Sequence, residues 1–149
     1  NKGARGEREI IQLLKPVVDK VYAEFPELGE PPKLQRNTLQ SDGGGFDIVG
    51  LDWLAIEVKF QENIQINPWW KQTISQAKPH QMPVLFYRKS HVKWRVMMKL
   101  YSPIGDKRFF CPADMSIENF MVYFEHRLRH ELETVAKEVG NHFEVRDFR

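Results

Sequence analysis

Leu54-Ala55-Ile56-Glu57-Val58-Lys59-Phe60 has the composition of a β-strand, and Phe46-Asp47-Ile48-Val49, ahead of a tight turn at Gly50-Leu51-Asp52, has that of a second. Because side chains alternate between the two faces of a strand, Glu57 and Lys59 share one face, and the apolar Ile56, Val58 and Phe60 share the other. The two segments therefore predict a β-hairpin with one apolar face and one small polar face.

Helices and strands are expected on both sides of this hairpin. In chain order they are a helix from about residue 5 to 21 that Pro16 kinks or divides, a short strand at 34–39, the hairpin, a helix at 68–78, strands at 83–87 and 92–100, and a long helix with an apolar stripe over 117–135. Asp114 or Ser116 can cap the start of the long helix, and Gly140 its end. A helix between the third and fourth strands allows a parallel crossover. The sequence thus predicts the α/β class, with a mixed central β-sheet of about five strands flanked by helices and an added C-terminal helix.

Length and composition predict one globular domain. The 149 residues are 42% hydrophobic and 28% charged, which is far from a disordered chain. We assign residues 1–149 to a single domain, with a core at about 2–110 and a C-terminal helical extension at about 112–149. The single cysteine, Cys111, excludes an internal disulfide and a CxxC site. No apolar stretch suits a membrane span or a signal peptide, so we expect a cytoplasmic protein without a membrane partner.

Positive charge is concentrated in the middle of the chain. Residues 1–62 carry eight Lys and Arg against eleven Asp and Glu, residues 112–149 carry five against eight, and residues 63–111 carry nine against Asp106 alone. Such a basic block could face an anionic ligand such as a phosphate backbone. An ordinary solvated face, balanced by acidic residues elsewhere in the fold, is the alternative.

The polar face of the hairpin has the residue types of a metal site. Asp47 precedes Glu57 by ten positions across one short turn, so neighbouring strands can bring the two carboxylates together. Two converging oxygen ligands, with other positions left for water and phosphate oxygens, suit Mg²⁺. Lys59 could orient or help to deprotonate a water on the metal and offset charge in a phosphoryl transition state. Alone, Glu-Val-Lys is a weak motif that also occurs in solvated strands.

An ordered series of landmarks resembles the PD-(D/E)XK nuclease superfamily: Glu7 in the first helix, then Gly43-Gly44-Gly45-Phe46-Asp47-Ile48-Val49, then Ile56-Glu57-Val58-Lys59. The opening Lys2-Gly3-Ala4-Arg5-Gly6-Glu7-Arg8-Glu9-Ile10, with Pro83-Val84-Leu85-Phe86-Tyr87-Arg88 and Trp94-Arg95-Val96, is similar to the archaeal Holliday junction resolvases over about residues 2–100. Phe46 stands where a proline usually precedes the aspartate. The three glycines, an insertion at 63–70 and the helix from Ile117 also depart from the archaeal pattern.

The resemblance implies a restriction-endonuclease-like fold and a metal-dependent DNA endonuclease. Asp47 and Glu57 would be the main metal ligands, Glu7 would add a carboxylate, and Lys59 would be the catalytic lysine. Mg²⁺ would be the cofactor, with Mn²⁺ as a substitute. The expected substrate is branched DNA, above all the four-way junction, and cleavage would leave 5′-phosphate and 3′-hydroxyl ends. The resemblance implies a role in recombination or repair. The protein would be nucleoid-associated or phage-encoded. There are two alternatives. One is an exonuclease or a repair or restriction-type nuclease of the same superfamily, and the other is a non-catalytic DNA-binding module on the same fold. Glu7 near a helix start also suits the helix dipole without any catalytic role.

DNA contacts are expected from residues around this site. By the resemblance, Arg8 and Arg36 would contact phosphates, and Gly44 in the glycine loop permits a close approach of the backbone to a phosphate or a metal. The further candidates are Arg5, Lys71, Gln72, Gln76, Arg88, Lys89, Lys93 and Arg95. Gln72 and Gln76 could instead lie on a solvated helix face.

A homodimer is expected, because resolving a four-way junction requires two symmetric nicks and one small domain with one metal site supplies one. The apolar stripe over 117–135 and Trp69-Trp70 offer the most apolar surface for a two-fold interface. Burial of the same side chains within the monomer is the competing account.

Overall fold

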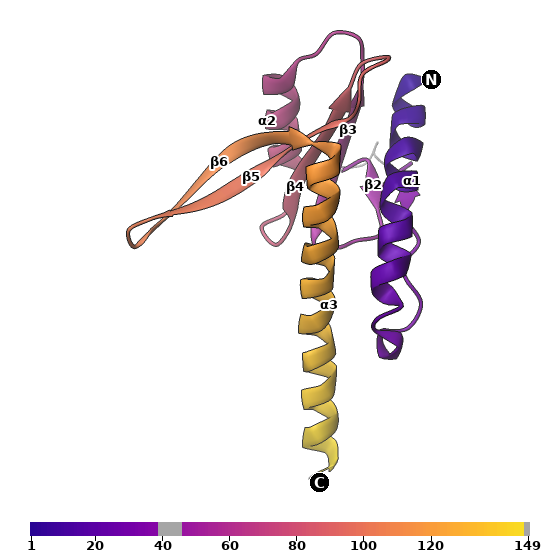
Figure 1. Cartoon of the computed structure of the whole chain (residues 1–149), viewed down its shortest axis with the longest axis vertical. Helices are drawn as coiled ribbons and strands as arrows, with labels where there is room; N and C mark the ends of the chain where they lie inside the picture. The colour runs from indigo at the N-terminus through magenta and orange to yellow at the C-terminus, as the bar shows by residue number, and fades with distance from the viewer. Residues whose placement is uncertain (39–45, 148–149) are drawn as a thin grey trace.

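The computed structural model describes residues 1–38 and 46–147 of the chain (Figure 1). Over these residues the elements are α1 (Lys2–Tyr22), the short 3-10 helix η1 (Pro26–Leu28), β1 (Gln35–Arg36), β2 (Ile48–Val49), β3 (Leu54–Phe60), α2 (Ile66–Gln76), β4 (Met82–Arg88), β5 (Arg95–Ile104), β6 (Lys107–Ser116) and α3 (Ile117–Asp147). The expected glycine loop, Gly43 to Gly45, lies outside the described residues. None of the described helices combines the length and the hydropathy needed to cross a lipid bilayer.

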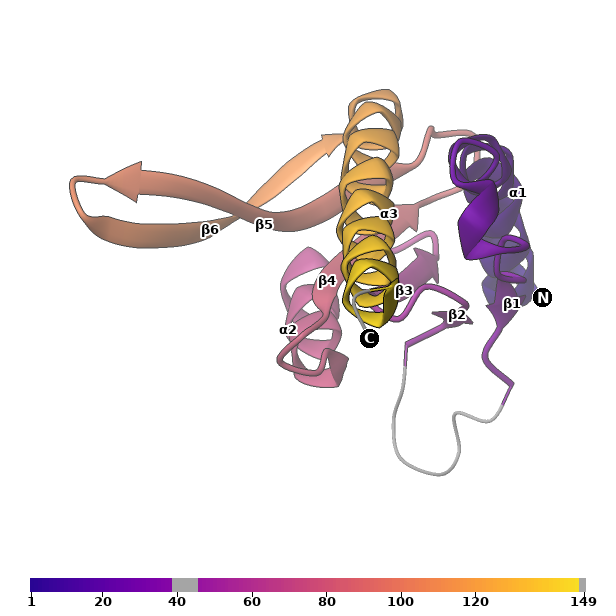
Figure 2. The ribbon, with the colours of Figure 1, turned by 90° about the horizontal axis from the view of Figure 1, so that it is seen from below.

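The strands form one mixed sheet of six, in the order β1-β2-β3-β4-β5-β6. All neighbours are antiparallel except β3 and β4, which run parallel because α2 crosses over between them. Helices α1 and α3 cover one face of the sheet and α2 covers the other (Figure 2). The predicted α/β class, the mixed sheet and the C-terminal helix are confirmed, with six strands in place of about five.

Alternation along β3 separates the core from the polar face. Ile56, Val58 and Phe60 are buried in the larger apolar cluster, which includes the inner faces of α1 and α3. Glu57 and Lys59 project to the opposite face of the strand. That face is the one on which α2 and β4 build a second, smaller cluster. The site residues of β3 therefore lie between the sheet and the α2 layer.

Close packing of α1 against β3 depends on a glycine. A Cβ atom on Gly6 would lie 3.1 Å from the Cβ of Phe60 and 3.2 Å from the ring of Trp94, so the missing side chain permits this approach. Pro16, expected to kink or divide the helix, does not divide it, and α1 is continuous. Pro16 is exposed, so the carbonyl that its ring leaves unpaired can bond to water.

Helix α3 begins at one of its predicted caps and runs past its predicted end. The hydroxyl of Ser116 accepts a hydrogen bond from the N–H of Asn119 at 3.1 Å, so Ser116 is the capping residue. The prediction that Gly140 ends the helix is wrong, because α3 continues to Asp147. An isolated glycine costs a helix about 1 kcal/mol and ends it when the backbone turns left-handed, which does not happen at Gly140.

The apolar stripe of α3 is used within the monomer. Its side chains Phe120, Phe124, Leu128 and Leu132 are all buried in the core shared with α1 and the sheet. Trp69 of α2 is buried as well. The competing account, burial inside the monomer, therefore holds for these residues, and they cannot form a dimer interface. Between Ile117 and Gly140, where the side chains of α3 are described, the large exposed apolar ones are Val122, Val135 and Val139.

Strands β5 and β6 continue beyond the sheet as a twisted two-stranded arm that the sequence pattern did not predict (Figure 1). β4 pairs with β5 only as far as Met98, whereas β5 and β6 pair with each other over their full length. Pro103 and Pro112 interrupt the strand pattern in the sequence. β6 is an edge strand, where a proline whose nitrogen faces solvent breaks no sheet hydrogen bond. The arm therefore forms despite an unfavourable local signal.

Candidate active site

Asp47 enters the site from the residue before β2. Its backbone N–H donates to the carbonyl of Ile56 at 2.7 Å, and its carbonyl accepts from the N–H of Asn37 at 2.8 Å. Its carboxylate accepts a hydrogen bond from the N–H of Val58 at 2.7 Å, and the residue is 8% exposed. The two backbone bonds hold Asp47 between Asn37 and β3, and the bond from Val58 fixes its carboxylate against β3.

Glu57 and Lys59 lie beside this carboxylate. Nζ of Lys59 is 3.3 Å from Oε1 of Glu57, and Glu57 is only 3% exposed. Burial and the negative charge of Asp47 raise the pKa of Glu57 to about 7, while Lys59 opposes the shift. The structure thus brings together the two acidic residues and the lysine that the hairpin pattern singled out.

Glu7 does not join this group. Its carboxylate pairs with Nε of Arg36 at 2.5 Å, across α1 and β1. Among the residues whose side chains the structure describes, 1–38 and 46–140, no three His, Cys, Asp or Glu side chains stand close enough to hold one metal ion. Glu7, expected as an additional carboxylate, therefore does not complete a set with Asp47 and Glu57. Arg36, expected on a phosphate, is occupied by a carboxylate.

The Asp47–Glu57 pair fits a hard divalent cation. Two adjacent buried carboxyl groups repel each other when both are ionised, and the raised pKa of Glu57 is one consequence. A divalent cation would offset this repulsion, and Mg²⁺ and Mn²⁺ both prefer oxygen ligands. The pair could supply two ligands and would leave the remaining positions to water or phosphate oxygens.

A second polar group lies next to Lys59 and was not predicted. The register of β3 and β4 pairs Lys59 with Tyr87. The hydroxyl of Tyr87 donates to the carboxylate of Asp114, which also pairs with Arg95 at 2.5 Å. Burial, and then the bond to Asp114, raise the pKa of Tyr87 to about 12, so it stays a neutral donor at physiological pH. The partner Asp114 sits on β6, a strand that the sequence pattern did not reveal.

The residues expected to contact DNA differ in how they are placed. Four cations carry ion pairs: Arg5 and Arg88 with Glu9, Lys93 with Glu118, and Arg95 with Asp114. The others are the exposed Arg8, Lys71 and Lys89 and the half-buried Gln72 and Gln76 of α2. Gly44 lies outside the described residues. Among the described residues, Arg8, Lys71 and Lys89 are thus exposed cations that lie outside these ion pairs.

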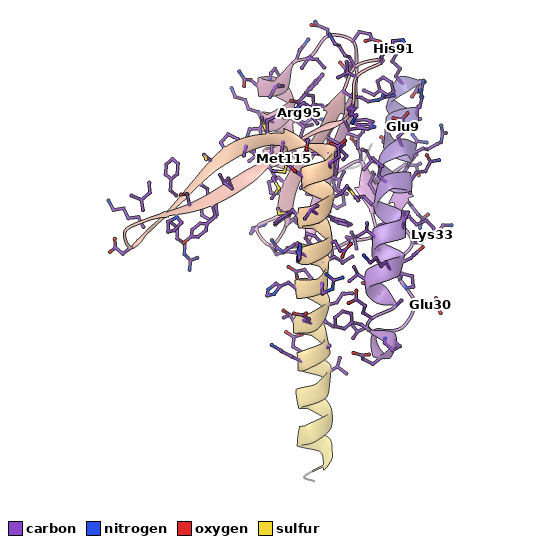
Figure 3. The ribbon with its side chains drawn as sticks, in the orientation of Figure 1. Glu9, Glu30, Lys33, His91, Arg95 and Met115 are labelled. Carbon is purple, nitrogen blue, oxygen red and sulfur yellow. The ribbon has the colours of Figure 1, made fainter. Side chains whose placement is uncertain are left out.

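Glu9, which Figure 3 labels on α1, organises a cluster that sequence reasoning missed. Its carboxylate accepts a hydrogen bond from Nε1 of Trp94 at 3.0 Å and pairs with Arg88 at 3.2 Å. The guanidinium of Arg88 lies 4.2 Å from the centre of the Phe60 ring, a cation–π contact. The Glu-Arg-Glu pattern at residues 7–9 was a signal for this cluster, but roles were assigned to Glu7 and Arg8 and none to Glu9. The cluster fastens α1 to the ends of β3 and β4.

A mixed sheet that carries a buried aspartate, a buried glutamate and a lysine side by side defines an α/β protein with an acidic site of the kind that binds metal ions. The chain belongs to the family described as "Phage putative PDDEXK endonuclease", which it matches over residues 1–145. The protein is therefore a nuclease-family member, as the resemblance to the PD-(D/E)XK superfamily implied.

One solved structure with a similar fold is that of Hjc from Archaeoglobus fulgidus, a Holliday junction resolvase from an archaeal hyperthermophile. The TM-score is 0.47 and the identity 17%, over 81% of this chain and 96% of that chain. A search of curated proteins gave no significant match. The family assignment rests on the match over residues 1–145.

Proposed function

We propose that the protein is a divalent-metal-dependent DNA endonuclease that cuts branched DNA, above all the four-way junction, and leaves 5′-phosphate and 3′-hydroxyl ends. The observation that carries the proposal is the pair of carboxyl groups at Asp47 and Glu57, 8% and 3% exposed, beside Lys59. Burying two adjacent carboxyl groups is unfavourable unless something compensates their charge. A metal site compensates it, and family membership supplies the reaction class.

Each site residue has a separate task in this proposal. Asp47 and Glu57 would hold the ion, Mg²⁺ with Mn²⁺ as a substitute, which when bound supplies Lewis-acid stabilisation of charge on the phosphate. The N–H of Val58 keeps the Asp47 carboxylate aimed into the site. Lys59 is half-buried, is oriented by Glu57, and would assist proton transfer from the attacking water or offset charge on the scissile phosphate.

Glu7 and Arg36 would take part through a change of partners. A DNA phosphate that binds the Arg36 guanidinium competes with the Glu7 carboxylate, because both are anions that match its donors. Glu7 would then be free to act as the additional carboxylate of the site. Phosphate contacts are also expected from Arg8, Lys71 and Lys89, and polar contacts from Gln72, Gln76 and Gly44. Such an enzyme would work where DNA is found, in the cytoplasm or on the nucleoid.

A homodimer is part of the proposal, because two symmetric nicks need two sites. The buried stripe of α3 is already used, so the candidate surface is the apolar remainder of that helix at Val122, Val135 and Val139. Sedimentation velocity at micromolar protein concentration, with and without junction DNA, measures the oligomeric state directly. A strict monomer under both conditions contradicts paired incision.

The testing experiment compares three labelled substrates: a synthetic four-way junction, a linear duplex of the same sequence and a single strand. Each is incubated with the full chain in Mg²⁺, in Mn²⁺ and in chelator, and the products are separated on denaturing gels. The proposal predicts metal-dependent, paired nicks near the branch point. Treatment of the products with DNA ligase identifies the groups at each nick, because ligase reseals only a 5′-phosphate beside a 3′-hydroxyl.

The other outcomes separate the alternatives. Digestion from the ends, or equal cutting of the linear duplex, would assign the protein to another nuclease type of the superfamily. Junction binding without cleavage in either metal would indicate a non-catalytic DNA-binding module. Cleavage in chelator would contradict the metal site itself.

A further inference from the structure

The β5–β6 arm, residues 99–112, projects away from the sheet and the helices (Figures 1 and 2). Arg95 and Met115 lie at its base (Figure 3). Beyond Met98 its two strands pair only with each other among the described strands. A two-stranded ribbon is marginally stable alone in water, and this one exposes several large apolar side chains. These are Leu100, Tyr101, Ile104, Phe109 and Phe110, each at least half exposed.

One face of the arm places an aromatic pair between two cations. Tyr101 lies opposite Phe110, and their ring centres are 5.4 Å apart. Residues two positions along a strand share a face, so Lys99 on one side and Arg108 on the other flank this pair. Arg108 lines a shallow hollow with both rings, and Lys99 lines a neighbouring one with the same rings. The face is therefore cationic at both ends and aromatic in the centre.

The same face leads back to the candidate active site. Paired residues of neighbouring strands share a face, and the register runs from Lys59 to Tyr87 and from Tyr87 to Arg95. Arg95, Met97, Lys99 and Tyr101 then alternate along β5 on one face. By alternation the aromatic pair belongs to the strand face that carries Glu57 and Lys59 at the centre of the sheet, and the twist of the ribbon brings its rings to a hollow beside Tyr123 and Arg127 of α3.

Charge favours an anionic partner for the arm. Residues 99–112 carry Lys99, Lys107 and Arg108 against Asp106 alone. Exposed rings flanked by cations match single-stranded or unstacked nucleic acid, in which flat bases alternate with phosphates. The opposite face, with Leu100, Ile104 and Phe109, has an apolar character that would also suit a second copy of the chain.

We propose that the β5–β6 arm is a DNA-binding element: Lys99 and Arg108 contact phosphates, and the Tyr101–Phe110 pair stacks on unpaired bases, such as those at a branch point. The proposal rests on the proposed function, because it requires the substrate to be DNA. It adds a second contact region, on the projecting arm, to the contacts expected around the acidic site.

The test measures binding in an inactive background, so that cleavage does not interfere. The Glu57→Gln protein is titrated against fluorescent four-way junction, single strand and linear duplex at several salt concentrations, and Kd is read from anisotropy. The same titrations are made after adding Lys99→Ala with Arg108→Ala, or Tyr101→Ala with Phe110→Ala. The matched control is Lys33→Ala, an exposed lysine remote from the arm (Figure 3).

Removing the two cations should weaken binding to every DNA and lower the slope of log Kd against log salt by about 1.8 for the duplex and about 1.4 for the single strand, because each lost phosphate contact removes about 0.9 or about 0.7 from the slope. Removing the rings should weaken single-strand and junction binding by about 5- to 100-fold and duplex binding much less. Lys33→Ala should match its parent. Thermal unfolding of each variant shows whether the remainder of the fold is intact. We expect it to be, because the substituted ring positions are about half exposed.

Three results would overturn the inference, and they are distinguishable. If the Glu57→Gln parent binds DNA and both arm variants bind as tightly as the Lys33→Ala control, the arm is not a DNA element, while the proposed function stands. If the parent binds no DNA, the proposed function fails with it. If the arm variants keep DNA affinity but lose self-association in sedimentation velocity, the arm is an interface with a second copy.

Discussion

The carboxylate of Asp47 accepts a hydrogen bond from the backbone N–H of Val58 at 2.7 Å. Val58 lies between Glu57 and Lys59, so this bond ties Asp47 to the strand segment that carries the glutamate and the lysine of the site. The register of the hairpin sets Ile48 opposite Ile56, and the length of the turn between the strands fixes that register. The local geometry of one hairpin therefore assembles the whole group.

Asp47→Asn should abolish divalent-metal binding with little loss of fold. The amide oxygen can still accept from the N–H of Val58, whereas the negative charge that attracts the cation is gone. The measurement is the rise in Tm as Mn²⁺ is added to the DNA-free protein, which should vanish in the variant. Asp52→Asn is the matched control, because the Asp52 side chain is 92% exposed in the nearby turn. Equal Mn²⁺ responses in the two variants would remove Asp47 from the metal site.

The metal-free protein should lose stability as the pH rises. The pKa of Glu57 is about 7 in the folded protein against an ordinary value of 4.5, so its contribution to stability is fully present below the lower value and is lost as the pH rises through the upper one. The free energy of unfolding should fall by on the order of 1–3 kcal/mol between about pH 5 and about pH 8. Denaturant unfolding in the presence of chelator, repeated across this pH range, measures the free energy of unfolding. Glu57→Gln cannot ionise and should lack this component, and an unchanged slope in that variant would assign the effect to other groups.

Lys59→Ala should lower the cleavage rate by at least about 10²-fold, the usual scale for a positioned proton-transfer or charge-stabilising group. Mn²⁺ binding should be largely retained, because the lysine is not a ligand. Single-turnover kinetics with saturating protein isolates the chemical step. Lys33→Ala, an exposed lysine, is the control. If both variants cut at the same rate, Lys59 is a solvated-strand residue without a catalytic task.

Gly6→Ala should destabilise the protein although alanine favours helix. The new Cβ would meet Phe60 at 3.1 Å and Trp94 at 3.2 Å, so these packed side chains or the helix must give by a few tenths of an ångström, at a cost of about 1–3 kcal/mol. Gly3→Ala is the matched control on the same helix, where the nearest atom is Oδ1 of Asn1 at 3.5 Å. That variant should be neutral or gain up to about 1 kcal/mol. Chemical denaturation of both proteins decides, and equal stabilities would contradict the close packing at Gly6.

The hairpin could be predicted from sequence because its information is local. Strand alternation separates Glu57 and Lys59 from the apolar residues, and a short turn limits where Asp47 can lie. Helix α1 was predictable from its periodic apolar face, which outweighs the exposed Pro16. The cap of α3 followed from the hydroxyl of Ser116.

The remainder depends on which distant segments meet. Strand β6 was missed because Pro112 breaks the local pattern, while its place at the sheet edge makes the proline harmless. The partners of Glu7 and Tyr87, at Arg36 and Asp114, lie 29 and 27 residues away along the chain. No periodicity reports such pairings. The sequence likewise does not show which segment packs on the apolar stripe of α3. The stripe suggested a dimer interface, whereas its side chains are buried in the core of the monomer.

The most direct test of the acidic pair as a metal-dependent nuclease site is the cleavage rate of labelled four-way junction by the wild-type protein and Glu57→Gln, side by side in Mg²⁺ and in chelator. Binding of the same DNA is measured in parallel, to show that both proteins hold it. The account predicts cleavage by the wild-type protein in Mg²⁺ alone and none by Glu57→Gln, with binding retained in both. Cleavage by Glu57→Gln at the wild-type rate, or cleavage that persists in chelator, would contradict it.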